Sequence, residues 1–116
     1  MAGVKDVLQE IEKAMEDTPA YVKGVKAVFQ FNLSGEEEGI YQLVIRDEGE
    51  LTIYEGEQEK ADCTLLMSSQ DFVKMARGKL NGTQAFMTGR LKVKGNIGLA
   101  LKLQGILASY NKERSR

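Results

Sequence analysis

Residues 61–107 read ADCTLLMSSQDFVKMARGKLNGTQAFMTGRLKVKGNIGLALKLQGIL, and their apolar pattern alternates between strand and helix. Apolar residues take every second position of residues 61–67, which is the period of a strand. Ser68 and Asn81 are residue types that cap helices, and each is followed three residues later by a polar side chain. The stretch therefore predicts a strand over 61–67, a helix over 68–78, a short helix over 81–89, a strand over 90–94 and a final helix from Asn96 to about Leu107.

The residues before this stretch show one helical pattern and three strand patterns. Apolar positions over residues 4–16 have helical spacing, and the helix must end before Pro19. Short polar turns separate the later segments, so successive strands should form an antiparallel meander. The glutamates of residues 36–38 fall in one such turn, where we assign them a solubilising role. The expected strands cover residues 26–33, 40–46 and 51–55.

The predicted final helix has a very wide apolar face. Its apolar residues cover roughly 220° of a helical wheel, whereas an ordinary surface helix has a stripe of about 100°. Gln104 lies inside this arc, where its amide needs polar partners. Either the chain's own core or a second subunit buries the helix on both sides, or part of the arc lines a cavity that holds an apolar ligand. The partner of Gln104 is then a backbone carbonyl in the first case, and a ligand head group or trapped water in the second.

The composition indicates one domain with divided charge. The chain has 116 residues, of which 42% are hydrophobic and 28% charged, with a single proline. Its formal net charge of -1 excludes a protein that binds nucleic acid through bulk positive charge. However, residues 1–60 carry 14 acids and 6 bases, while residues 61–116 carry 3 acids and 10 bases. The two halves therefore have net charges of -8 and +7.

Several residue types required for common chemistries are absent or single. With 0 histidines there is no Ser-His or Cys-His pair and no imidazole metal ligand. The single Cys63 can form no intrachain disulfide, and we interpret it as a small buried side chain in a reducing compartment. The first ten residues carry charges where a signal peptide is apolar, and no apolar run approaches the ~18 residues of a membrane span. We therefore expect a cytoplasmic protein without metal or cofactor.

Four motifs within residues 61–107 carry a resemblance to a known family. They are the ADCT strand opening, the D-F…G-K helix end, the Q-A-F-x-x-G-x-L-K-V-x-G-N stretch and the G-L-A-x-K-L-Q helix. In this order they closely resemble the sterol carrier protein type-two (SCP-2) lipid-transfer domain, and the elements over residues 4–55 agree in order and length. The resemblance implies one α+β domain over residues 1–116. Its five-stranded, largely antiparallel sheet would be covered on one face by helices, with an apolar tunnel between the two.

The resemblance also implies a function and a set of site residues. It implies non-catalytic binding and carriage of a fatty acid, fatty acyl-CoA, phospholipid or sterol-like ligand. The chain ends in residues 113–116, ERSR, and not in a Ser-Lys-Leu-like peroxisomal address, so we expect a stand-alone cytoplasmic member with a frayed tail over 108–116 that carries a fatty acyl chain. By position, the lipid site would comprise Phe31, Leu43, Ile53, Met75, Phe86, Met87, Ile97, Ala100, Leu101, Leu103, Gln104 and Leu107.

Basic residues beside the expected site suggest an anionic partner. Clustered bases attract anionic head groups, carboxylates or a membrane surface. The G-x-x-G of residues 95–98 does not indicate nucleic-acid binding, because it has no base between its glycines and follows a strand, whereas a KH clamp joins two helices. GxSxG, P-loop and GxGxxG motifs are missing, so independent catalysis is not expected. The residues assigned to head groups or a membrane are Arg90, Lys92, Lys94 and Lys102.

A second class of function stays open. The final helix could use its wide apolar face to form a homodimer, or to bind a partner as an accessory or structural subunit. This alternative predicts a dry, filled interior, whereas the carrier predicts a cavity in the monomer.

Overall fold

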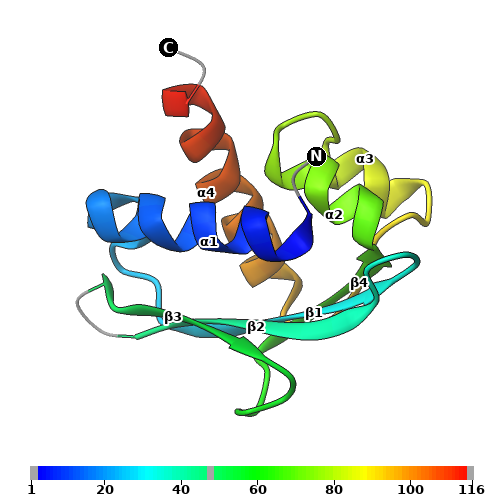
Figure 1. Ribbon diagram of the computed structural model, residues 1–116, viewed down its shortest axis with the longest axis horizontal. Helices are drawn as coiled ribbons and strands as arrows, with labels where there is room; N and C mark the ends of the chain where they lie inside the picture. The colour runs from blue at the N-terminus through cyan, green and yellow to red at the C-terminus, as the bar shows by residue number, and fades with distance from the viewer. Residues whose placement is uncertain (1–2, 47–48, 115–116) are drawn as a thin grey trace.

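A computed structural model describes residues 3–46 and 49–114, and it places helices above one face of a five-stranded sheet (Figure 1). The expected α+β fold is therefore confirmed, with element boundaries that differ by a few residues. The elements are α1 (Val4–Asp17), the 3-10 helix η1 (Pro19–Val22), β1 (Ala27–Ser34), β2 (Gly39–Ile45), β3 (Leu51–Glu55), β4 (Cys63–Ser68), α2 (Ser69–Ala76), α3 (Gly82–Met87), β5 (Lys92–Gly95) and α4 (Ile97–Arg114).

The sheet is mixed, which corrects the expected meander. The strand order is β3-β2-β1-β4-β5, and β4 pairs with β1 in parallel, with Phe29 opposite Cys63. The other three pairings are antiparallel. The turn after β3 was expected to return the chain beside β3. Instead, residues 56–62 cross the outer face of the sheet and deliver β4 to the far side of β1.

Gln42 holds this crossing connection in place. Its side chain is fully buried, and its Oε1 accepts from the backbone N–H groups of Gln58 at 3.1 Å and Glu59 at 3.0 Å. Its Nε2 donates to the carbonyl of Glu59 at 2.7 Å and to Oε1 of Gln30, its register partner on β1, at 2.9 Å. Because both ends of the amide are hydrogen-bonded, these bonds compensate for the cost of removing Gln42 from water.

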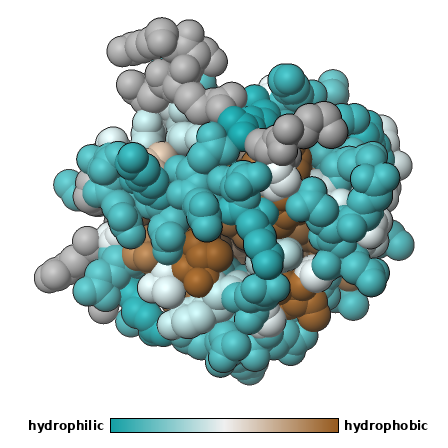
Figure 2. All heavy atoms as spheres, viewed as in Figure 1, coloured by the Kyte–Doolittle hydropathy of each residue, from teal (hydrophilic) through white to brown (hydrophobic). Residues whose placement is uncertain are grey.

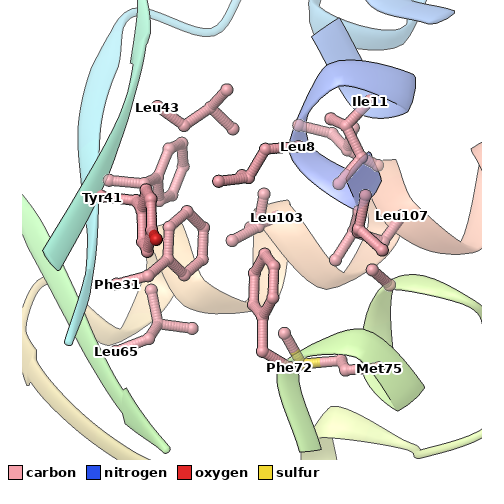
Figure 3. Packing of buried hydrophobic residues seen from close by; sticks show 14 of the residues in the cluster. Leu8, Ile11, Phe31, Tyr41, Leu43, Leu65, Phe72, Met75, Leu103 and Leu107 are labelled. Carbon is pink, nitrogen blue, oxygen red and sulfur yellow. The ribbon is translucent and has the colours of Figure 1, made fainter. Parts of the chain in front are cut away.

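The core lies between the inner face of the sheet and the helices (Figure 3). Leu8 of α1, Phe72 of α2 and Leu103 of α4 converge on the inward side chains of the sheet. The rings of Phe31 and Phe72 pack with centroids 5.0 Å apart and planes tilted by 59°. Cys63 belongs to this core and is completely buried, as expected. Burial, followed by the charge of neighbouring Asp62, raises the pKa of its thiol.

Side-chain caps begin the last three helices where the sequence predicts them. A side-chain oxygen of Ser68, Asn81 and Asn96 accepts a backbone N–H at 3.0, 2.8 and 3.2 Å respectively. These bonds satisfy donors that have no partner inside a helix. Strand β5 begins two residues later than expected, because the N–H of Leu91 still donates to the carbonyl of Ala85 at the end of α3.

Glu37 has a structural role beyond the solubilising one that we assigned to its turn. Its Oε2 accepts from the backbone N–H of Val4 at 2.9 Å, which places a carboxylate at the N-terminus of α1. Its own N–H donates to Oγ of Ser69 at 3.3 Å. The β1–β2 turn therefore joins the first turns of α1 and α2 to the end of the sheet.

Helix α4 continues beyond the end that the sequence suggested. It reaches Arg114, whereas we expected it to stop near Leu107 and to leave a frayed tail. Tyr110 is buried one turn after Leu107, and Nδ2 of Asn111 donates to the carbonyl of Ala76 at 2.9 Å. This anchoring to α2 explains the extra turns, while residues 115–116 lie outside the described range. None of the described helices has the length and apolar character to cross a bilayer.

Candidate functional site

The wide apolar arc of α4 divides into a buried part and an exposed part. Leu103, Ile106 and Leu107 are buried in the core. Ile97 and Leu101 are 52% and 60% exposed, although they belong to the same arc. The chain's own core therefore accounts for only part of the arc.

The neighbouring helix α3 also presents apolar side chains to solvent. Only Gly82 and Ala85 of this helix are buried, whereas Phe86 and Met87 are 46% and 79% exposed. Together with Ile97 and Leu101 they are the large hydrophobic residues that the described chain leaves exposed. Exposed apolar side chains that gather in one region of a soluble domain indicate a binding surface.

Gln104 joins these two helices. Its Nε2 donates to Oγ1 of Thr83 in the first turn of α3 at 3.2 Å. A side chain at Gly82 would overlap Oε1 of Gln104, so the amide rests directly on the backbone of α3. Leu101 lies about one helical turn before Gln104, and Met87 about one turn after Thr83. The exposed apolar side chains therefore flank the Gln104–Thr83 contact.

A cleft of about 510 Å³ opens on the other side of this contact. Its volume is within the range of sites that hold small organic ligands. Its apolar lining includes Met75 and Leu107, which belong to the core, and Gln104 lies on its wall. The remaining lining residues are Gly78, Lys79, Leu80, Asn81, Gly82, Gln84, Ala108 and Asn111.

The structure does not bring all the expected lipid-site residues together. Phe31 and Leu43 lie on the inner face of the sheet, inside the packed core (Figure 3). Ile53 is half-buried and borders a separate groove of about 200 Å³ between α1 and the sheet. Apolar residues are visible between the helical layer and the sheet on this otherwise largely hydrophilic side (Figure 2). Ala100 is half-buried on α4.

Of the four expected head-group residues, Arg90 forms an ion pair within the chain, whereas the three lysines are exposed. Arg90 binds the carboxylate of Asp71 with two hydrogen bonds of 2.6 and 3.1 Å, which joins the segment after α3 to the first turn of α2. The side-chain hydrogen bond from Arg90 is the main cause that lowers the pKa of Asp71 below its ordinary value, against the opposing effect of burial. Lys92, Lys94 and Lys102 are exposed.

Sequence reasoning singled out Gln104 but not Gly82 and Thr83, the residues that its side chain contacts. Asn81, which precedes them, was recognised only as a helix cap. A glycine in the first turn of a helix, which costs stability, was the available signal that another group approaches the backbone there. Among the residues that the structure describes, no cluster of acidic or cysteine side chains is suited to a metal ion.

The chain has this fold, the four motifs of residues 61–107, and a final helix whose apolar face is partly buried and partly exposed. Together these features define a lipid-binding domain of the SCP-2 class. It belongs to the SCP-2 sterol transfer family, whose family model matches residues 8–108. The chain is 39% identical over 109 residues to hydroxysteroid dehydrogenase-like protein 2 of Bos taurus, and 46% identical over 107 residues to that of Xenopus tropicalis. These matches cover 94% and 90% of this chain but only 26% and 25% of the relatives. The chain thus spans about a quarter of their length.

Solved structures show the same architecture. Sterol carrier protein domain 2 of Helicoverpa armigera is 32% identical, with a TM-score of 0.72 and coverage of 90% of this chain and 85% of that one. Sterol carrier protein 2 of Yarrowia lipolytica is 27% identical, with a TM-score of 0.70 and coverage of 88% and 87%. Sterol carrier protein-2 of Aedes aegypti, solved with palmitate, has a TM-score of 0.73 and coverage of 94% and 98%, but at 20% identity it shows a common fold alone.

Proposed function

We propose that this chain binds and carries a long-chain fatty acyl ligand between α3 and α4, without chemistry of its own. The observation that carries the proposal is the exposure of apolar side chains on both helices beside the Gln104–Thr83 contact. An acyl chain laid between the helices would cover Ile97 and Leu101 on one side and Phe86 and Met87 on the other. The palmitate complex of the Aedes aegypti relative supports a ligand of this chemical class.

The energetic balance favours opening the contact between the two helices. Breaking one hydrogen bond such as Gln104–Thr83 costs about 0.5–1.5 kcal/mol. Burying an acyl chain stabilises the complex by about 0.8 kcal/mol for each methylene removed from water. Two buried methylenes therefore offset the hydrogen bond, and the rest of the chain drives binding. Helix α3 is suited to move because it buries only Gly82 and Ala85.

Gln104 would then take part in ligand recognition. Once released from Thr83, its Nε2 can donate to the carboxylate or carbonyl oxygen of the ligand. Its Oε1 would move away from the backbone at Gly82. The same side chain would thus bridge the two helices when the site is empty and meet the polar end of the ligand when it is filled.

Palmitate titration of delipidated protein tests this proposal. Replacing Leu101 by Gln should weaken palmitate binding about tenfold or more, because a leucine side chain contributes about 1.5–3 kcal/mol when it becomes buried. Leu66→Gln is the matched control, since Leu66 is half-buried on the outer face of the sheet. Equal effects of the two substitutions would contradict the proposed site.

The exposure of Ile97 and Leu101 also fits the accessory-subunit alternative. Analytical ultracentrifugation of the delipidated protein separates the two functions. A stable dimer that binds no palmitate would replace the carrier by a subunit that uses α4 for association. A monomer that binds palmitate would exclude that alternative.

A further inference from the structure

Two contacts between α4 and the connection from α2 to α3 bound the cleft of about 510 Å³. At one contact, Oε1 of Gln104 rests against the backbone at Gly82. At the other, Nδ2 of Asn111 donates to the carbonyl of Ala76 at 2.9 Å, and a Cβ at Gly78 would come within 3.2 Å of the same side chain. Gln104 and Asn111 lie two turns apart on α4, which is about 10 Å, so the contacts leave room between them.

One side of α4 changes from apolar to polar along its length. Residues at intervals of four and three positions share this side, namely Ile97, Leu101, Gln104, Ala108 and Asn111. Ile97 and Leu101, near the start of the helix, are apolar and exposed. Ala108 and Asn111 line the cleft, and Gln104 lies between the two regions. An amphiphile along this side would place its apolar chain near Leu101 and its polar end in the cleft.

The lining of the cleft carries one positive charge and no negative charge. Lys79 is the only charged side chain among the described residues that line it. Residues 75–111, which supply these lining residues, include no Asp or Glu. Lys79 is exposed and forms no ion pair with an acid in residues 3–46 and 49–114. A negatively charged group that enters the cleft would therefore meet a cation that no described acid neutralises.

The other polar side chains of the lining suit the oxygen atoms of such a group. Gln84 and Gln104 bring amide N–H donors, and Asn81 keeps its amide nitrogen as a donor because its oxygen caps α3. Amide donors and a cation together favour anionic oxygens. A water molecule occupies about 30 Å³ in the liquid, so the cleft has more room than a carboxylate needs and can hold a phosphate with bound water.

We propose that this cleft receives the anionic end of the ligand, a carboxylate or a phosphate, and that Lys79 selects ligands by that charge. The inference rests on the proposed function, because the apolar chain of the same ligand lies between α3 and α4. Opening the Gln104–Thr83 contact joins the cleft to the exposed apolar side chains, since Gln104 lies between them. Lys79 is then a specificity-determining residue, and a ligand without charge binds through its chain alone.

Three probes with the same alkyl length test the role of Lys79. They are palmitate, hexadecyl phosphate and the uncharged hexadecanol, each measured with delipidated protein by competition against an uncharged fluorescent alkyl probe. Lys79→Gln should weaken binding of the two anions about fivefold, as expected for one ion pair at an exposed site, and change hexadecanol binding by less than about twofold. The preference of the wild-type protein for the anions should also shrink as salt is raised.

Lys102→Gln is the matched control for charge. Lys102 is an exposed lysine of α4 that does not line the cleft. Its replacement removes the same charge from the same half of the chain, and it should change binding of all three probes by less than about twofold, because an exposed charge away from the ligand is screened.

A second pair of variants tests the space in the cleft. Ala108 is exposed and lines the cleft, and leucine is nearly as good a helix former as alanine. Ala108→Leu should therefore fold normally and weaken binding of hexadecyl phosphate more than that of hexadecanol. Ser109→Leu is its control, since the neighbouring Ser109 is exposed but does not line the cleft.

The responses of the two anions identify the head group. A loss confined to hexadecyl phosphate assigns the cleft to phosphate, and a loss confined to palmitate assigns it to carboxylate. Either result keeps Lys79 as the selecting residue. Equal effects of Lys79→Gln and Lys102→Gln, or equal weakening of charged and uncharged probes, would overturn the inference.

Hexadecanol separates this inference from the proposed function. Binding of all three probes without a preference for charge would remove the head-group cleft and keep the acyl site between α3 and α4. Wild-type protein that binds none of the three probes would remove the proposed function itself.

Discussion

The side-chain amide of Gln104 donates to the hydroxyl of Thr83 at 3.2 Å and joins two helices that both expose apolar side chains. Gln104 is only half-buried, so water can replace either partner when the bond opens. A contact of this kind is weak enough to open for the acyl ligand that we propose, and it joins the two helices when no ligand is bound.

We expect Gln104→Leu to change ligand preference more than stability. A single hydrogen bond contributes about 0.5–1.5 kcal/mol, so the midpoint of urea unfolding should move little. The ratio of affinities for palmitate and its methyl ester should fall, because the carboxylate loses a donor. A drop in stability with an unchanged ratio would show that Gln104 is a structural amide only.

The close approach of Gln104 to Gly82 predicts energetic coupling between these residues. Alanine favours a helix over glycine by about 1 kcal/mol, but in the wild-type background its Cβ must displace Oε1 of Gln104. Gly82→Ala should therefore be more stabilising in a Gln104→Ala background. A double-mutant cycle measured by urea unfolding should give a coupling of at least about 0.5 kcal/mol. Strict additivity would mean that the glutamine moves aside freely.

The sequence determines the start of α4 and the width of its apolar arc, but not which part of that arc is buried in the core and which part is exposed to solvent. Ile97 and Leu107 are both large and apolar, yet one is exposed and the other is buried. Which side meets the core depends on how α4 lies over β4 and β5, and helical spacing carries no information about that placement. The partner of Gln104 depends on the same tertiary approach.

Sequence patterns predicted correctly those features that residues close together in the chain determine. The caps at Ser68, Asn81 and Asn96 were predicted correctly because each bond spans only two or three residues. The crossing before β4 depends on Gln42, whose partners Gln58 and Glu59 lie 16 and 17 residues away. The extra turns of α4 likewise depend on a contact across 35 residues to Ala76.

The Asp71–Arg90 ion pair predicts a pH dependence of stability. Because Arg90 lowers the pKa of Asp71, the folded state favours the ionised carboxylate more than the unfolded state does. This contribution is present above the ordinary pKa of aspartate and is lost as the pH falls through the lowered value in the folded protein. The difference in melting temperature between wild type and Asp71→Asn should therefore be largest near neutral pH and shrink below about pH 4. A difference independent of pH would contradict this role.

The hydrogen bonds of Gln42 predict that its replacement strongly lowers the stability of the fold, far from the proposed lipid site. Gln42→Leu removes the partners of two backbone N–H groups and one carbonyl, and each buried group left without a partner costs about 1–3 kcal/mol. The variant should be among the least stable single substitutions in urea unfolding. Gln58→Ala is a suitable control because it keeps the backbone N–H that Gln42 accepts. If Gln42→Leu loses no more stability than Gln58→Ala, water replaces the hydrogen bonds of the amide.

Isotope-filtered NOESY with ¹³C-labelled palmitate locates the bound acyl chain on the protein. We expect contacts from the labelled chain to methyl groups of Ile97, Leu101 and Met87. Contacts that are restricted to the groove of Ile53 between α1 and the sheet, or to Leu66 on its outer face, would contradict a site between α3 and α4.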